Sequence, residues 1–313
     1  MKLLIDAGNT RIKWAIVNDM TRRAQASGET TSHSTRPSKD VGQVAGYGAG
    51  MSFPRILPQS DGYAITSDSA SVAGSPSRMA SSFISNVSEA DNSEWLRRGV
   101  LPVEQAGDLS QQFAGVYDIQ EIWVSNVAGE EVAQHIRNIK VDQSASFNFI
   151  VAREMQCGVR NGYANPGQLG SDRWAALIAA WHLVRGKCMV VNCGTAITID
   201  TLSEQGKFIG GLILPGVELM RHSLVAATNQ LRPEQGSYTK FPLNTADALF
   251  SGTIQACCGA IERQYALLDG DSAPVVLSGG AAGILHKSLK LPLRVVDNLV
   301  LQGLLLIAQE SGA

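Results

Sequence analysis

Two segments far apart in the chain share one pattern, and this repetition constrains the fold more than any other feature. LLIDAGNTRIKWAI begins at Leu3, and MVVNCGTAITIDTL begins at Met189. Each has an apolar run, an Asp or Asn, a small residue near a glycine and a second apolar run, which is typical of a β-hairpin with a glycine-centred turn. One such hairpin in each half of the chain predicts two similar domains that face each other across a cleft.

The remaining periodicity predicts strands that alternate with helices. Apolar runs closed by small or polar residues indicate buried strands, and spacing of three to four residues indicates helices, so the architecture is α/β. Thr245 is expected to cap the longest helix. The glycine-rich segments 210–216 and 277–283 are expected to be turns after strands, and the second offers a backbone surface for adenine. We expect strands over 2–10, 121–129, 188–200 and 273–283, and helices over 172–185, 245–268 and 298–309.

Length and composition suggest how these elements are divided. A chain of 313 residues favours about two domains, which we place at 1–187 and 188–313. The stretch 26–92 is rich in Ser, Gly, Ala and Thr, which indicates long loops or an insertion, although its short piece GYAIT suits a strand.

Charge, hydropathy and cysteine usage exclude several classes of protein. A formal net charge of −2 gives no reason to expect nucleic acid or an acidic membrane as a partner. No apolar run approaches the length of about 18 residues that a membrane span needs, and the apolar run broken by Asp6 is too short for a signal peptide. Five cysteines without framework spacing indicate reduced thiols, and the five histidines share no metal-ligand spacing. We therefore expect a cytoplasmic protein.

The first hairpin turn, DAGNTRIK, has the groups that a nucleotide phosphate and its magnesium ion require. Asp6 is suited to the metal, Gly8 permits close backbone approach, Asn9 and Thr10 are hydrogen-bond donors, and Lys13 supplies positive charge. The alternative is an ordinary hairpin turn, because the segment does not match the P-loop pattern.

Two further segments extend this hypothesis. In NCGTAIT, Gly194 and Thr195 repeat the close approach and the hydroxyl donor. In GQLGSDRWAAL, Asp172 and Arg173 follow a glycine-containing loop and begin an apolar helix, so Asp172 could accept a proton from a substrate hydroxyl while Arg173 binds an anionic group. The alternative for the second segment is a helix N-terminus with a favourably placed aspartate and a solvated arginine.

Taken in order, DAGNT, Y-x6-G-x-DR, GTAIT, GGLILPG and SGG resemble the type III pantothenate kinases, which belong to the superfamily of acetate kinase, sugar kinases, Hsp70 and actin. The resemblance covers the first 18 residues and the chain from about residue 121 to its end. It implies two ribonuclease H-like (actin-like ATPase) domains with a central cleft. It also implies ATP-dependent phosphorylation of pantothenate to 4'-phosphopantothenate, the first step of coenzyme A biosynthesis.

The resemblance further implies roles for individual residues. Asp172 would be the general base, and Asp6 would be nearest the magnesium. The family is a homodimer that uses Mg2+ with ATP and a monovalent cation, K+ or NH4+, so Thr245 would contact pantothenate from the second domain or from a partner subunit. The implied ATP-binding residues are Asp6, Ala7, Gly8, Asn9, Thr10, Arg11, Ile12, Lys13 and Thr195. The implied pantothenate-binding residues are Tyr163, Gly170, Ser171, Asp172, Arg173 and Thr245.

Two departures from the family pattern leave alternatives open. Asn192 stands where the family often has the Asp that helps to bind the monovalent cation, and the stretch 26–92 does not match the compact elements expected there. One alternative is a superfamily kinase that acts on a sugar or a small acid, against which the Y-x6-G-x-DR element argues. The other is a nucleotide-binding regulatory protein of the same fold without turnover.

Overall fold

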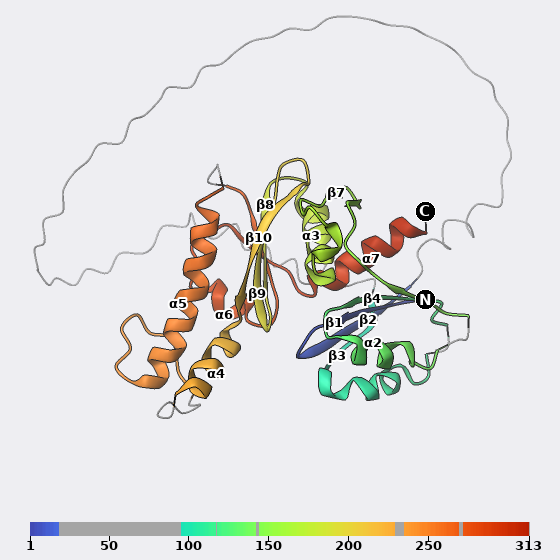
Figure 1. The fold of residues 1–313 in the computed structure, drawn as a ribbon, viewed down its shortest axis with the longest axis horizontal. Helices are drawn as coiled ribbons and strands as arrows, with labels where there is room; N and C mark the ends of the chain where they lie inside the picture. Colours follow the sequence, from blue (N-terminus) through green and yellow to red (C-terminus); the bar gives the residue numbers. More distant parts are fainter. Residues whose placement is uncertain (19–94, 117, 142–143, 229–234, 269–271, 313) are drawn as a thin grey trace, which may run out of the picture.

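The computed structural model describes residues 1–18, 95–116, 118–141, 144–228, 235–268 and 272–312 (Figure 1). The suspected insertion 26–92, with its GYAIT segment, lies outside the described residues. In the described residues two five-stranded sheets stand side by side, each with helices on its faces (Figure 1). All five cysteines are free thiols, as predicted.

The first sheet has the strand order β3-β2-β1-β4-β5. Antiparallel pairing of β1 with β2 forms the first predicted hairpin and sets Asp6 opposite Lys13, while β1 pairs in parallel with β4. The strands are β1 Lys2–Ala7, β2 Arg11–Val17, β3 Trp95–Pro102, β4 Glu121–Asn126 and β5 Ser146–Phe149.

The second sheet repeats this arrangement in the order β10-β9-β8-β11-β12. The second predicted hairpin is β8 with β9, and β8 pairs in parallel with β11 just as β1 pairs with β4. The prediction of two similar halves from the repeated hairpin is therefore confirmed. The strands are β8 Cys188–Cys193, β9 Ala196–Leu202, β10 Phe208–Pro215, β11 Val275–Ser278 and β12 Leu293–Val295.

Three apolar cores organise the helices into layers. Helices η1 and α2 cover the outer face of the first sheet, and α5 and α6 cover the outer face of the second. Helices α3 and α7 pack together in a central core that both sheets share. The helices are η1 Val103–Phe113, α2 Glu130–Arg137, η2 Pro166–Gln168, α3 Ser171–Val184, α4 Val217–Ala227, α5 Thr245–Tyr265, α6 Ala282–His286 and α7 Leu299–Ser311, and a small hairpin pairs β6 Met155–Gln156 with β7 Val159–Arg160.

The central layer determines where the polar residues of the hairpins point. Successive side chains of a strand alternate between the two faces of its sheet. Leu4 of β1 and Leu202 of β9 both lie in the central core. Asp6 and Asp200, each two residues away from one of these leucines, therefore face the same central layer as α3.

Two sequence predictions about local structure are wrong. Asn244, not Thr245, caps α5, because the Asn244 side chain accepts a hydrogen bond from the Asp247 backbone N–H and Thr245 is already the first helical residue. The segment 210–216 is not a turn: its first six residues lie in β10, where a β-carbon at Gly211 would collide with Asp200 and with the backbone of Ile199.

The proposed division at residue 187 stays a prediction. Helix α7, from the C-terminal part of the chain, contacts β1, β2 and β4 of the first sheet. No helix in the described ranges combines the length and apolar character needed to cross a membrane.

The crossing of α3 and α7 gives a prediction about stability. A β-carbon at Gly303 would collide with the backbone of Ala175, so Gly303→Ala should destabilise the fold by about 1–3 kcal/mol through overpacking. Gly259 in α5 is the matched control: it has open space, and Ala there should stabilise by about 0.5–1 kcal/mol through helix propensity. Thermal unfolding of both variants checks this, and equal shifts of the two unfolding temperatures would contradict it.

Candidate active site

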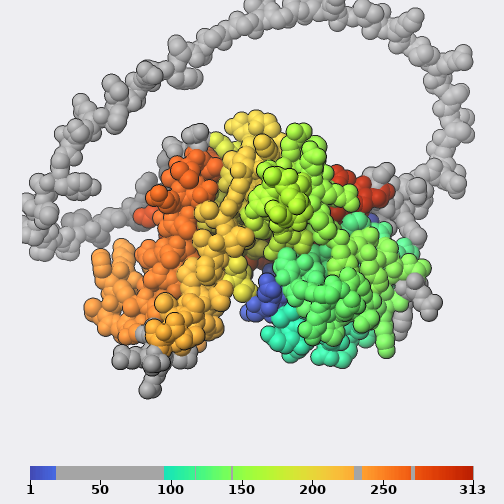
Figure 2. Space-filling view, viewed as in Figure 1, coloured from blue at the N-terminus to red at the C-terminus, as the bar shows by residue number. Residues whose placement is uncertain are grey.

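The tips of the two predicted hairpins meet. The hydroxyls of Thr10 and Thr195 are 2.6 Å apart and hydrogen-bonded. Each tip is a tight turn, closed by a hydrogen bond from Gly8 N to Arg11 O in the first and from Gly194 N to Ala196 O in the second. In Figure 2 the blue N-terminal residues appear between the gold second sheet and the green part of the chain.

Two more glycine turns lie against these tips. Gly216 N donates to Thr195 O at 2.8 Å, and Ala281 N donates to Cys193 O at 3.1 Å. The Arg11 guanidinium lies beside Gly280, 3.9 Å from where a β-carbon would stand. Four glycine-containing segments that are distant in sequence therefore surround one place between the two sheets. Of the other residues predicted for ATP, Asn9 is exposed at the first tip, whereas Ala7 and Ile12 are buried in the outer core and can contribute only backbone atoms.

Asp6 lies near the end of β1, next to the hairpin tips, and faces the central layer. The pKa of Asp6 is raised to about 7, mainly by burial; Lys13 opposes the rise and the nearby charge of Asp172 contributes to it. Two carboxylates and one ammonium group thus lie close together at the end of β1. A site that penalises its own negative charge in this way favours a bound cation.

Asp172 is the second residue of α3, whose N-cap is Gly170. Its Oδ1 accepts the backbone N–H of Arg173 at 2.8 Å, and burial raises its pKa. Ser171 beside it shares a hydrogen bond of 2.9 Å with buried Ser125, which is the register neighbour of Asp6. The hydroxyl pair fixes the start of α3 against the end of β4, and so fixes Asp172 relative to Asp6.

Arg173 is not the solvated arginine of the alternative interpretation. It is 5% exposed, and its Nε and Nη2 donate to the two carboxylate oxygens of Asp200, Nε at 3.1 Å. Its Nη1 donates to the Tyr163 hydroxyl at 3.2 Å, and its guanidinium lies near the rings of Tyr163 and Phe208. Tyr163 and Arg173, predicted to act together, are therefore in contact.

The two other predicted residues lie differently. Asn192 of β8 is half-buried, with Thr198 and Ser278 as its register neighbours, so one amide and two hydroxyls are close to each other. Thr245 is exposed at the start of α5, which packs on the face of the second sheet opposite α3. Within one chain, Thr245 and Arg173 therefore lie on opposite sides of the second sheet.

Sequence reasoning gave no role to Asp200, Ser125 or Phe208. Asp200 had a signal, because an aspartate inside the buried strand AITIDTL needs a partner when it is charged. Ser125 and Phe208 had none, because a serine or a phenylalanine at a strand end is ordinary.

The raised pKa of Asp6 predicts that its negative charge lowers the stability of the fold. Because the folded pKa is about 7 and the ordinary value is 3.8, the folded chain binds more protons than the unfolded chain between these values. Stability therefore falls as pH rises through this window, and the full penalty is present above about pH 7. Asp6→Asn should raise the unfolding temperature of the magnesium-free protein at about pH 8, and the gain should shrink towards about pH 4.

Asp247→Asn is the control with the opposite sign. Hydrogen bonds from Ser237 N and Asn244 lower the pKa of Asp247, so its removal should decrease stability above that pKa. A lower unfolding temperature for Asp6→Asn at about pH 8 would contradict the assignment of strain to Asp6.

Comparison with known proteins places this geometry in a family. The sequence model described as type III pantothenate kinase matches residues 98–267. The chain is 46% identical over 224 residues to a type III pantothenate kinase of Nitrosospira multiformis, covering 71% of this chain and 86% of the relative. It is 45% identical over 222 residues to one of Aromatoleum aromaticum, covering 70% and 91%.

A further relative bears on the stretch suspected as an insertion. The type III pantothenate kinase of Janthinobacterium sp. is 39% identical over 321 residues, covering 98% of this chain and 97% of the relative. Most of the stretch 26–92 therefore falls inside that alignment.

The fold also has a match among solved structures. A Sinorhizobium meliloti protein described as a 2-dehydro-3-deoxygalactonokinase is 12% identical, covers 99% of this chain and 96% of its own, and has a TM-score of 0.51. At this identity the match supports the fold alone, which is the predicted actin-like arrangement of two α/β units. The family match covers more than half of the chain, and the chain belongs to the type III pantothenate kinase family.

Proposed function

We propose that this chain transfers the γ-phosphoryl group of ATP to the primary hydroxyl of pantothenate, giving 4'-phosphopantothenate in the first step of coenzyme A biosynthesis. The observation that carries the proposal is the position of Asp172. This carboxylate starts α3 within electrostatic reach of Asp6, where the two hairpin tips meet. A phosphate-binding turn and a proton acceptor would thus be adjacent, in a chain that belongs to the type III pantothenate kinase family.

Phosphoryl transfer depends mainly on positioning and charge neutralisation. The Gly8–Arg11 turn and Thr195 would hold the ATP phosphates, with Lys13 and Arg11 offsetting their charge. Asp172 would orient the pantothenate hydroxyl and accept its proton. Burial raises the pKa of Asp172, which makes it a stronger base than an exposed aspartate.

The donor set fits a magnesium ion that is shared with ATP. In the described part of the chain, no three His, Cys, Asp or Glu side chains are grouped to hold a metal by themselves. Magnesium usually takes one or two carboxylates together with substrate phosphates, so Asp6 at the end of β1 suits it. The ion would neutralise the charge of the β- and γ-phosphates.

A monovalent cation, K+ or NH4+, belongs to the same proposal. Asn192 offers a neutral oxygen ligand, and Thr198 and Ser278 are its register neighbours. Loss of the family's usual carboxylate at this position should weaken affinity for the cation without abolishing it.

The direct test is pantothenate-dependent ADP release, measured in a coupled assay with and without K+ or NH4+. Asp172→Asn should lower kcat by about 10²- to 10⁴-fold while ATP binding stays nearly intact, because the amide cannot accept the proton. Asp108→Asn, a surface change in η1, is the control. Turnover like that of the unmodified chain would remove Asp172 from the mechanism.

The same assay separates the alternatives. A nucleotide-binding regulatory protein would bind ATP and release no ADP with any acceptor. A kinase for a sugar or another small acid would release ADP with those compounds and not with pantothenate. Absence of pantothenate-dependent release under every cation would overturn the proposal.

We also propose that two chains form a homodimer through the face made by β10, α4 and the segment before α5. Strand β10 is the edge of the second sheet, and Ile213 on it is 64% exposed. Phe241 and Leu243 are 86% and 99% exposed, and Leu219 and Leu224 of α4 are also exposed. An apolar surface of this extent on a soluble enzyme indicates a protein partner.

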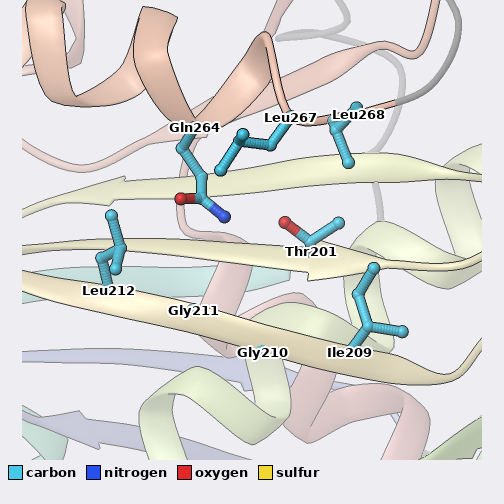
Figure 3. Close-up of a pocket in the computed structure, with 8 residues that line it drawn as sticks. All are labelled: Thr201, Ile209, Gly210, Gly211, Leu212, Gln264, Leu267 and Leu268. Atoms are coloured by element: carbon cyan, nitrogen blue, oxygen red, sulfur yellow. The ribbon is translucent and has the colours of Figure 1, made fainter.

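A shallow pocket of about 180 Å³ lies on the outer face of the second sheet, beside the end of α5 (Figure 3). Gln264 in the last turn of α5, with Leu267 and Leu268 just after the helix, lies across the pocket from Thr201 and from Ile209 and Leu212 of β10. Thr201 and Asp200 are neighbours on β9 and point to opposite faces. The pocket is therefore separated from the active site by the sheet. Leu212 faces the pocket, whereas Ile213, the register neighbour of Thr198, points to the opposite face of the sheet.

Ile213→Asp should give a monomer in sedimentation experiments, because it places a charge in the apolar face. Leu96→Asp is the matched control, since Leu96 of β3 is 50% exposed on the first sheet. If Thr245 acts from the partner subunit, the monomer should also have a raised KM for pantothenate. A dimer that persists in Ile213→Asp would contradict the choice of this face.

Cytoplasmic localisation completes the proposal. Its support is the set of five free cysteines, which suits a reducing compartment.

A further inference from the structure

Arg173 is held in place by Asp200, a residue that has no direct part in the proposed reaction. The Arg173 and Asp200 side chains are 6% and 2% exposed, and they form a two-pronged ion pair through Nε, Nη2 and both carboxylate oxygens. Burial raises the pKa of Asp200, and Arg173 opposes that rise. The pair is almost fully buried, so separating the two partners would leave an uncompensated charge in the interior.

A count of the N–H donors on Arg173 shows how many remain available for a ligand once the ion pair has formed. A guanidinium has five N–H donors. Asp200 accepts two of them, and Tyr163 accepts a third through Nη1. Within the described residues, the two remaining donors, one on each Nη atom, have no recorded protein acceptor. Two parallel N–H groups are the number that a carboxylate accepts in a two-pronged pair.

The surroundings hold the plane of the guanidinium. Its carbon is 6.0 Å from the Tyr163 ring centroid and 5.8 Å from that of Phe208. A β-carbon at Gly211 would collide with both Asp200 Oδ1 and Arg173 Nη2, so β10 approaches the pair as closely as a backbone can. The Arg173 side chain is long and flexible, and these contacts remove its freedom before any ligand arrives.

We propose that Asp200 is a positioning residue, which turns Arg173 so that its two remaining N–H donors face the carboxylate of the acceptor substrate. This inference rests on the proposed function, in which the acceptor is pantothenate. Asp200 thereby acts on specificity for an acidic acceptor, through Arg173, and does not touch the reacting atoms. It also cancels the charge of Arg173, so recognition depends on the direction of the donors more than on net attraction.

Asp200→Asn is the main variant, because it keeps the shape and one acceptor oxygen and removes the second charged contact. We expect the KM for pantothenate to rise by about tenfold, with the KM for ATP within about twofold of the unmodified chain. A merely structural role would change both KM values or neither. The unfolding temperature is measured alongside, so that a loss of folding is seen directly.

If Asp200→Asn fails to fold, a less disruptive variant, Thr198→Val, still tests the proposal. The Thr198 side chain also hydrogen-bonds Asp200, and Thr198→Val removes that bond with little change of volume. Because Thr198 also borders the proposed cation site, the variant is assayed at saturating K+, where we expect a smaller rise of about threefold in the KM for pantothenate alone. Thr253→Val is the matched control, because the Thr253 hydroxyl is likewise buried and, among the described residues, donates to the Leu249 carbonyl within α5.

Epistasis tests whether Asp200 acts through Arg173. In an Arg173→Met background, Asp200→Asn should add less than about twofold to the KM for pantothenate, since there is no guanidinium left to orient. An unchanged KM for pantothenate in folded Asp200→Asn, or additive effects in the double variant, would overturn the proposal. Failure of the proposed function is distinct, because the unmodified chain would then show no pantothenate-dependent turnover at all.

Discussion

The structure depends on one helix pair that is buried between two sheets. Helix α3 is apolar on nearly all sides, and its small residues let α7 approach until Gly303 touches the backbone of Ala175. A helix with this composition has no solvent face and must be enclosed. Since β1, β4, β8 and β9 all pack near this layer, the N-terminus of α3 falls where the two sheets meet. Asp172 and Arg173 take their places from that packing.

The same packing explains how much of the site could be predicted from the sequence. The hairpins were predictable because alternation and glycine turns are local properties, and Asp6, Lys13 and Thr195 lie on them. Asp172 was predictable as a helix start after a glycine loop. The pairing of Asp200 with Arg173 was not, because nothing in one strand says which helix will pack against it. The β10 segment was misread as a turn because its two glycines serve a strand: Gly211 permits a close approach to Asp200, and Gly210 has a positive φ at an irregularity in the pairing with β9.

The site concentrates charge in an unusual proportion. The charge of Asp172 raises the pKa of both Asp6 and Asp200, and Lys13 and Arg173 only partly oppose these rises. Such an arrangement is unfavourable by itself and becomes favourable when cations and a polyphosphate bind. The packing of the core offsets this unfavourable electrostatic energy. In it, the hydrogen bond between Ser125 and Ser171 keeps the start of α3 against β4.

The contact between Thr10 and Thr195 has a consequence for how a nucleotide enters. In the structure each hydroxyl has the other as its hydrogen-bond partner, and the two belong to different sheets. A phosphate that uses both hydroxyls therefore replaces one hydrogen bond and does not simply add two, so little net affinity comes from them. The phosphate would instead bridge the two halves of the molecule. It would replace the only side-chain hydrogen bond that the described parts of the two hairpin tips share.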